Sequence, residues 1–411
     1  MVSGGARAVA RCDALGAPPY SDMADGLYRG YLTPAYAHAQ AALAGWMGEA
    51  GMAVRRDPAA NLIGRYEGLD PAAPALLIGS HIDSVRDAGR YDGPLGIMLG
   101  VEAVAALHRA GRRLPFPIEV IAFGDEEGSR FPAAMLTSRA VAGTLATEAL
   151  DLRDGDGVAL ADAGVDVRAY LSAARAPGAT LAYLEAHIEQ GPVLEAQGLA
   201  LGTVTGIAAQ LRYQLTLRGM AGHAGTTSMP LRRDALAGAA EAMLAIETLA
   251  RDAASDLVAT VGRIEALPGA PNVIPGEVRF TLDVRSGDAG RRNRAAEAMI
   301  EAIAAIADRR GLDWATTLVH DLPASPCDSQ LMAIMDAAVA ATGQPAFRLV
   351  SGAGHDAMVM AALCPTAMLF MRCKHGISHN PAEHVDPADA DAALQAMLGF
   401  IDKLGEYVAA A

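Results

Sequence analysis

The chain has 411 residues, of which 52% are hydrophobic and 19% charged, so it is long enough to form two or three globular domains. Its 33 Lys and Arg against 47 Asp and Glu give a net charge of −14, and no basic cluster interrupts this acidic background. These numbers exclude a disordered chain and argue against nucleic acid as a partner.

Membrane and secretory signals are weak. The longest nearly uncharged apolar run, 357–371, is shorter than the ~18–20 residues that a bilayer-spanning helix needs. The N-terminus carries no apolar segment followed by a small-residue cleavage site, so we expect a cytoplasmic protein without a membrane partner. Four cysteines lie far apart without a CxxC pair and are expected to be ordinary thiols: Cys12, Cys327, Cys364 and Cys373.

The first half of the chain has the pattern of an α/β sheet. Thr33 and Pro34, a plausible cap and first-turn proline, precede a predicted helix over 35–52. Short apolar runs at 75–79 and 117–124 indicate strands, and 93–108 between them indicates a helix. Both strands end abruptly in polar residues, which is where open α/β sheets place their sites.

The middle of the chain changes character. Strict alternation of apolar and polar residues at 211–218 and 278–285 predicts strands with one wet face. Helices near 231–252 and 289–309 and strands near 257–267 and 312–321 complete a set of two helices on one face of an antiparallel sheet. After Pro326, a helix at 329–342 and a strand at 367–372 resume the α/β pattern. We therefore expect an α/β domain of residues 1–210 and 327–411 with an inserted, smaller α+β (ferredoxin-like) domain of residues 211–326.

Histidines and carboxylates coincide at five places in the expected α/β domain. Divalent metal ions need imidazole nitrogen and carboxylate oxygen converging from several loop ends, so this supply suits a two-metal hydrolase. A single histidine at a strand end is more often structural, and a Glu-Glu pair is usually a solvated loop; the coincidence of five such places favours the metal site. The residues are His81 with Asp83, Asp92, Glu126 with Glu127, His187, and His379.

Seven ordered motifs make the sequence recognisable. They are GSHIDSV (79–85), YDGPLG (91–96), EEGSRF (126–131), HIEQGP (187–192), GHAGTT (222–227), PNVIPG (271–276) and SGAGHD (351–356). The chain closely resembles the M20 metallopeptidase-like amidohydrolases from roughly residue 20 to the C-terminus. Within that family it is similar to the branch of N-carbamoyl-L-amino acid hydrolases, β-ureidopropionases and allantoate amidohydrolases.

The resemblance implies two divalent metal ions per subunit, zinc or manganese, with cobalt able to substitute. The positions matching the first-metal ligands are His81 and His187, and those matching the second-metal ligands are Glu127 and His379, with Asp92 as the bridging carboxylate. It further implies that Asp83 orients His81. Glu126 matches the general base, which takes a proton from water and passes it to the leaving nitrogen.

The resemblance also implies how substrate is bound. Asn272 and Arg285 match a pair that clamps the substrate carboxylate, and Gln190, Gly354 and His355 match further substrate contacts. His223 matches a histidine that, in family dimers, reaches the partner's active site and polarises the scissile carbonyl. Residues 211–326 would then be a lid and dimerisation domain, and the protein a homodimer.

We expect a binuclear metal amidohydrolase that cleaves a ureido C–N bond in a small anionic substrate. Phe131-Pro132 and the segment MRCKHG (371–376) are most similar to allantoate amidohydrolases, so allantoate is the first choice of substrate. The alternatives are an N-carbamoyl-L-amino acid hydrolase or β-ureidopropionase, then an M20 aminopeptidase or deacylase. A catalytically silent binding protein would require loss of Glu126 or a ligand. Two departures from the family pattern, Thr137 for glycine and Ser228 for proline, concern loop geometry.

Overall fold

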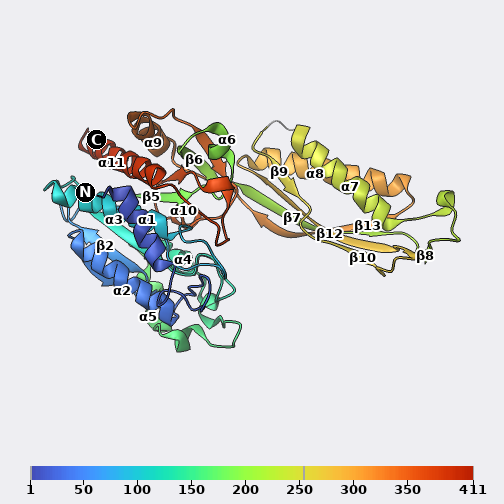
Figure 1. Ribbon diagram of the computed structural model, residues 1–411, viewed down its shortest axis with the longest axis horizontal. Coiled ribbons are helices and arrows are strands. Elements are labelled where there is room, and N and C mark those ends of the chain that lie inside the picture. Colours follow the sequence, from blue (N-terminus) through green and yellow to red (C-terminus); the bar gives the residue numbers. More distant parts are fainter. Residues whose placement is uncertain (1, 253–254, 411) are drawn as a thin grey trace. The chain divides into compact units, whose positions relative to one another are not determined.

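The computed structural model describes residues 2–252 and 255–410, which form two compact units (Figure 1). The first unit contains the chain up to Thr205, Cys327–Leu349, and the residues from Ala353 onward. The second contains Gly206–Pro326 and Val350–Gly352.

A nine-stranded mixed sheet organises the first unit, although its edge strand β14 and the last two residues of β6 and of β15 are counted with the second unit. Its order is β1-β2-β4-β3-β5-β16-β6-β14, and β15 pairs with β6. The four central strands, β4, β3, β5 and β16, are parallel, so their carboxyl ends meet at one edge. The strands are β1 (Ala53–Arg56), β2 (Leu62–Tyr66), β3 (Ala75–His81), β4 (Ile118–Phe123), β5 (Thr180–Ile188), β6 (Leu201–Ile207), β14 (Ser325–Pro326), β15 (Arg348–Ser351) and β16 (Thr366–Met371).

Helices cover both faces of this sheet. Helix α3 packs on β3, β4 and β5, α9 and α11 pack on β16, and α1 lies against α3 and α11. From the other side α10 contacts β5 and β16, and α4 contacts α10. The helices are α1 (Gly4–Leu15), α2 (Pro34–Glu49), α3 (Pro94–Arg109), α4 (Leu136–Ala142), α5 (Val167–Tyr170), α6 (Val193–Gln197), α9 (Ser329–Ala341), α10 (Asp356–Met360) and α11 (Pro387–Ala410).

The predicted cap of α2 is confirmed, because the Thr33 side chain accepts a hydrogen bond from the backbone N–H of Tyr36. The helix ends at Glu49 rather than at residue 52, since Gly51 adopts a φ of +83° and the chain turns there into β1. Helix α1 was not expected from the sequence.

The second unit has the expected α+β layout. Its five-stranded antiparallel sheet has the order β10-β12-β7-β13, with β9 pairing to β12. Apolar side chains of β7 and β12 form its core with α7 and α8, while the polar residues that alternate with them lie on the other face. The elements are β7 (Ala209–Arg218), α7 (Ala235–Asp252), β9 (Val258–Thr260), β10 (Ile264–Leu267), β12 (Glu277–Ser286), α8 (Ala289–Arg309) and β13 (Asp313–Leu322), with the short pair β8 (Gly222–His223) and β11 (Val273–Ile274). This βαββαβ order and strand arrangement are ferredoxin-like.

The first boundary between the units lies at residue 205, a few residues before the expected 210. The reason is strand pairing: Ala209 and Gln210 pair with the end of β12, so they belong with the second sheet. The short segment Val350–Gly352 also joins the second unit, where the N–H of Ala208 bonds the carbonyl of Ser351.

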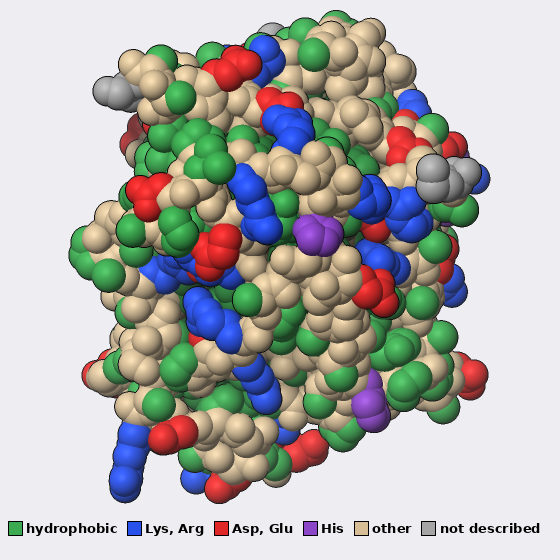
Figure 2. Space-filling model, turned by 90° about the vertical axis from the view of Figure 1, so that its left-hand side faces the viewer, with side chains coloured by type: hydrophobic (Ala, Val, Ile, Leu, Met, Phe, Trp, Pro, Cys, Tyr) green, Lys and Arg blue, Asp and Glu red, His purple; other side chains and the backbone are tan. Residues whose placement is uncertain are grey.

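The surface is mixed in charge. Basic and acidic side chains are interspersed on the face drawn in Figure 2, and many arginines are paired, as Arg112 is with Asp402. Among the described residues, no helix is both long and apolar enough to cross a bilayer.

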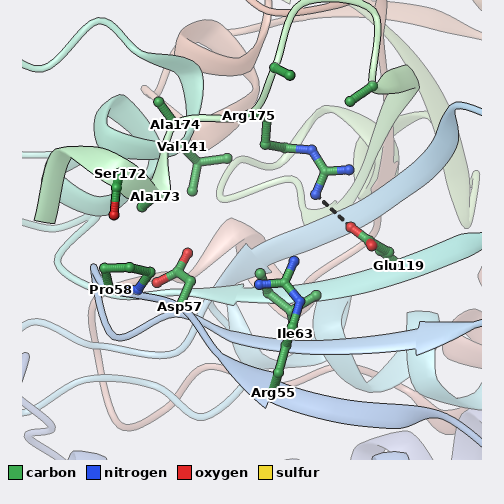
Figure 3. Close-up of a pocket in the computed structure, with 12 residues that line it drawn as sticks. Arg55, Asp57, Pro58, Ile63, Glu119, Val141, Ser172, Ala173, Ala174 and Arg175 are labelled. Atoms are coloured by element: carbon green, nitrogen blue, oxygen red, sulfur yellow. Dashed lines mark hydrogen bonds and ion pairs between the residues drawn. The ribbon is translucent and has the colours of Figure 1, made fainter. Parts of the chain in front are cut away.

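A cavity of about 280 Å³ in the first unit is lined by the buried Glu119 and by Arg175, which form an ion pair (Figure 3). Glu119 on β4 receives Arg175 on one carboxylate oxygen at 2.5 Å and Arg65 on the other at 3.0 Å. Asp57, also in its wall, accepts hydrogen bonds from the backbone and side chain of Asn61. Because these carboxylates are already satisfied, we interpret this cavity as structural.

Burial would raise the pKa of Glu119, but Arg175 and Arg65 outweigh burial and hold that pKa below its ordinary value. The carboxylate therefore contributes stability above the unfolded pKa of about 4.3, and this contribution is lost as the pH falls through the lower, folded value. We predict that Glu119→Gln lowers the free energy of unfolding by ~1–3 kcal/mol at neutral pH. Urea unfolding should show that the difference in free energy of unfolding between wild type and Glu119→Gln is smaller below pH ~4.3 than at neutral pH. An equal difference at acidic and at neutral pH would contradict this account.

Candidate active site

The side chains expected to bind metal lie at the carboxyl edge of the four parallel strands. His81 is the last residue of β3, Glu126 and Glu127 follow β4, and His187 is near the end of β5. His379 lies in the loop after β16. Parallel pairing brings these strand ends together, which explains why residues about 300 positions apart in sequence meet in one place.

Asp92 lies at the centre of the cluster and is 7% exposed. Its Oδ1 is 3.1 Å from His187 Nε2 and 3.6 Å from His81 Nε2, and its Oδ2 is 3.1 Å from His379 Nε2. The following Gly93 has a φ of +83°, and a Cβ there would collide with the carbonyl and ring of His81. A glycine is therefore required where the Asp92 loop passes the first histidine.

Two overlapping sets of candidate metal ligands share Asp92. One contains His81, Asp92 and His187, and the other contains Asp92, Glu127 and His379, with ligand atoms within 4.8 Å of one another in each set. His379 Nε2 is also 3.3 Å from Glu127 Oε1. Both sets and Glu126 line one cavity of about 240 Å³.

The histidine tautomers fit metal binding. His187 Nδ1 lies 2.8 Å from the carbonyl of Ile188, and His81 Nδ1 lies 3.1 Å from the carbonyl of Asp83. An Nδ1–H that donates to a carbonyl leaves Nε2 with a free lone pair. Among the described residues, buried His187 Nε2 has no hydrogen-bond partner, although Asp92 Oδ1 is near, so its lone pair is available for a cation.

Asp83 joins the ends of β3 and β4. Its carboxylate lies 3.5 Å from His81 Nδ1 and accepts the backbone N–H groups of Glu126 at 3.1 Å and Glu127 at 3.2 Å. One fully buried side chain thus fixes both the first histidine and the glutamate pair.

Burial and neighbouring side chains strongly shift the pKa values of two carboxyl groups in the site, Asp92 and Glu126. Burial by itself would raise the pKa of Asp92, but the adjacent imidazoles of His187, His379 and His81 outweigh it and hold that pKa well below its usual value. The carboxylate is therefore ionised, which is the state that metal binding would require. Burial raises the pKa of Glu126 well above its usual value, with His81 partly opposing. A desolvated glutamate beside a cluster of candidate metal ligands is suited to proton transfer.

Three of the expected substrate contacts line the same cavity: Gln190, Gly354 and His355. Gln190 Nε2 donates to Asp92 Oδ2 at 2.8 Å, so this side chain lines the cavity and also contacts the central carboxylate. The ring of His355 packs against that of His187, with centroids 4.4 Å apart. Burial lowers the pKa of His355 well below its usual value, so the ring is neutral.

The other expected substrate residues belong to the second unit, where the structure separates them. His223 on β8 and Asn272 before β11 lie side by side at the start of β12, and both are exposed. Arg285 lies near the other end of β12. Eight strand steps of ~3.3 Å each place the two ends roughly 26 Å apart. Asn272 and Arg285 of one chain therefore do not contact the same carboxylate.

Ser378 and Glu383 contact Asp92 but were not identified from the sequence. Ser378 Oγ is 2.7 Å from Asp92 Oδ2, and Glu383 Oε1 accepts the N–H of Asp92 at 3.1 Å. Their position beside His379 was the available signal. Thr137, one of the departures, holds the end of β4, because its hydroxyl bonds both the N–H and the carbonyl of Gly124.

Comparisons with known proteins agree with this geometry. The model of peptidase family M20/M25/M40 matches residues 77–403. An N-carbamoyl-L-amino acid amidohydrolase of Geobacillus stearothermophilus is 42% identical, covering 89% of this chain and 90% of that protein. An allantoate deiminase of Arabidopsis thaliana is 41% identical, covering 96% and 81%. The crystal structure of an amidase of the hydantoinase/carbamoylase family from Burkholderia multivorans superposes with a TM-score of 0.89 at 34% identity, covering 98% of each chain. The chain therefore belongs to the M20 peptidase family, in its hydantoinase/carbamoylase branch of metal-dependent amidohydrolases.

Proposed function

We propose that this chain hydrolyses the carbamoyl C–N bond of a small ureido carboxylate, with allantoate as its preferred substrate. The observation that carries the proposal is the contact of one Asp92 oxygen with two imidazoles and of the other with a third, within a chain of this family. A carboxylate with its two oxygens placed in this way is suited to bind two cations at once.

In this proposal, His81 and His187 bind the first metal ion, Glu127 and His379 bind the second, and Asp92 binds both. The mixed oxygen and nitrogen ligands suit zinc or manganese, with cobalt as a substitute. When bound, such ions supply Lewis acidity that polarises the carbamoyl carbonyl and makes water easier to deprotonate.

Glu126 is the proposed general base. It takes one proton from the attacking water, whose oxygen bonds to the carbamoyl carbon, and delivers that proton to the departing nitrogen as the C–N bond breaks. The carbamate released in this way decomposes to ammonia and carbon dioxide. Asp83 keeps Glu126 in place through its backbone N–H, and neutral His355 lies in the same cavity with the capacity to donate a hydrogen bond to substrate.

Arg285 is the proposed anchor for the substrate carboxylate. Its Nε and Nη2 bond Asp283, and its Nη1 bonds the carbonyl of Gly352. These contacts use three of the five N–H donors of a guanidinium. As far as the described residues are concerned, two donors remain for a planar anion, which a guanidinium with a fixed orientation recognises well.

We further propose that a homodimer completes the site, with residues 211–326 acting as lid and dimerisation domain. The support is the separation of Asn272 from Arg285 along β12, since a clamp made from both needs Asn272 and His223 of a second copy. The edge strand β13 has unpaired backbone groups on one side and carries Leu318 and Val319, which are 49% and 54% exposed. An edge of this kind is suited to pairing with another chain.

A second candidate function has support of its own. The N-carbamoyl-L-amino acid amidohydrolase is as similar to this chain as the plant allantoate deiminases, which favours N-carbamoyl-L-amino acids as substrates. Phe131 and Pro132 favour allantoate. Both substrates carry a ureido group and a carboxylate, so the same residues serve either reaction.

The substrate class is tested by ammonia release from metal-loaded protein. We expect allantoate to be the best of a panel that also contains N-carbamoyl-L-amino acids, 3-ureidopropionate and dipeptides. Glu126→Gln is the matched control: it should keep its metal and lose on the order of 10²–10⁴ in kcat, the usual contribution of general acid–base catalysis. Cleavage of dipeptides alone would overturn the ureido assignment, and loss of metal in the variant would reverse the roles of the adjacent glutamates.

Metal content is tested separately. Elemental analysis should find two equivalents of divalent metal per chain, and chelation should abolish turnover until Mn²⁺, Zn²⁺ or Co²⁺ is restored. His379→Ala should lose one equivalent, because only the second set contains it, while Asp92→Ala should lose both. Full turnover in protein shown to be metal-free would contradict the proposal.

Subunit mixing tests whether His223 acts in trans. Glu126→Gln and His223→Ala should each be inactive alone, but mixed subunits should form heterodimers in which one site combines Glu126 of one chain with His223 of the other. Activity should then recover in part. If mass spectrometry verifies mixing and activity stays at the level of the parents, His223 acts within its own chain or not at all.

A further inference from the structure

The side chain of Glu383 links two loops that lie far apart in sequence. It is 5% exposed, and its Oε1 accepts backbone N–H groups from Tyr91 at 2.8 Å and Asp92 at 3.1 Å. Its Oε2 lies 3.2 Å from Ser378 Oγ. One loop carries Asp92 and the other carries His379. The Glu383 carboxylate therefore contacts both loops that position proposed metal ligands, but it is not itself one of the proposed ligands.

Ser378 completes the link through side chains. Its hydroxyl is 2.7 Å from Asp92 Oδ2, the oxygen that also faces His379. Glu383 therefore fixes the backbone of Asp92 directly and lies one hydroxyl away from its carboxylate. The position of Asp92 relative to His379 is set by these contacts, because Ser378 precedes His379 in the chain.

The loop of His379 needs such a restraint. His379 adopts a φ of +53°, which side-chain-bearing residues rarely adopt and which persists only when surrounding contacts impose it. The N–H of Glu383 bonds the carbonyl of Asn380, so a tight turn connects the histidine to the carboxylate.

Gly89, in the chain segment just before Asp92, gives independent support for the close packing of the Glu383 side chain. A Cβ at this buried position would lie 2.2 Å from Glu383 Cδ and 2.3 Å from its Oε1. No positive φ requires glycine there, since Gly89 is not among the residues in the left-handed region. The close approach of the Glu383 side chain is thus the reason that residue 89 has no side chain.

We propose that Glu383 is a positioning residue, which holds the Asp92 loop and the His379 loop at the spacing that metal binding requires. This inference rests on the ligand assignment of the proposed function. It predicts a loss of metal affinity, which is measured without substrate and is therefore separable from the choice of substrate. Residues that orient ligands typically contribute 10–100-fold to metal affinity.

The test is a competition titration of Mn²⁺ and Zn²⁺ against a chelator, with elemental analysis and the melting temperature of the metal-free protein. Glu383→Ala should bind metal roughly 10–100-fold more weakly. Glu383→Gln should bind nearly as well as wild type, because its amide oxygen still accepts both N–H groups. Asp57→Ala is the matched control, since Asp57 is also a buried carboxylate that accepts a backbone N–H, but it lies outside the metal cavity.

Wild-type affinity in Glu383→Ala would overturn the proposal, as would an equal loss in Asp57→Ala, which would show general destabilisation. If Glu383→Ala does not fold, Gly89→Ala decides, because it displaces the carboxylate without removing it. It should weaken metal binding in the same direction, and unchanged affinity there would refute the link. A protein that hydrolyses no ureido substrate, yet loses metal in these variants, would refute the proposed function and leave this inference standing.

Discussion

Asp92 is a buried anion, and the structure of the site follows from the need to stabilise it. Removed from water, a carboxylate is stable only where charges and hydrogen-bond donors replace its hydration. Here the replacements are three imidazoles, the Ser378 hydroxyl and the Gln190 amide. They come from the ends of β3 and β5 and from the loops after β5 and β16, so none of the local segments forms this environment alone.

The parallel strands make that convergence possible. Because β4, β3, β5 and β16 run in one direction, the residues that follow these strands all lie at the same edge of the sheet. Asp83 then fixes the end of β3 relative to the residues after β4. It accepts hydrogen bonds from the backbone N–H groups of Glu126 and Glu127 and lies beside His81. The same side chain thereby positions the proposed base Glu126 and two of the proposed ligands, His81 and Glu127.

The second unit imposes a different constraint. Most of the ten-residue strand β12 separates its start, near His223 and Asn272, from Arg285 near its end. An extended backbone cannot fold back within that length, so one copy offers these groups to two different places. This rigidity is the reason that the proposed carboxylate clamp requires residues of two chains.

Local patterns in the sequence predicted much of this protein. The apolar runs that end in Ser80 to Asp83 and in Asp125 to Glu127 identified two strands and the polar residues after them, and the alternation at 211–218 and 278–285 identified the wet-faced sheet. Such signals depend on near neighbours, which the sequence lists directly. The order of the strands, the contact of Glu383 with an amide 291 positions away, and the separation of Asn272 from Arg285 were decided only by the tertiary structure. The physical reason is that residue spacing encodes the geometry of one segment, whereas the meeting of two loops depends on which strands pair and in which direction.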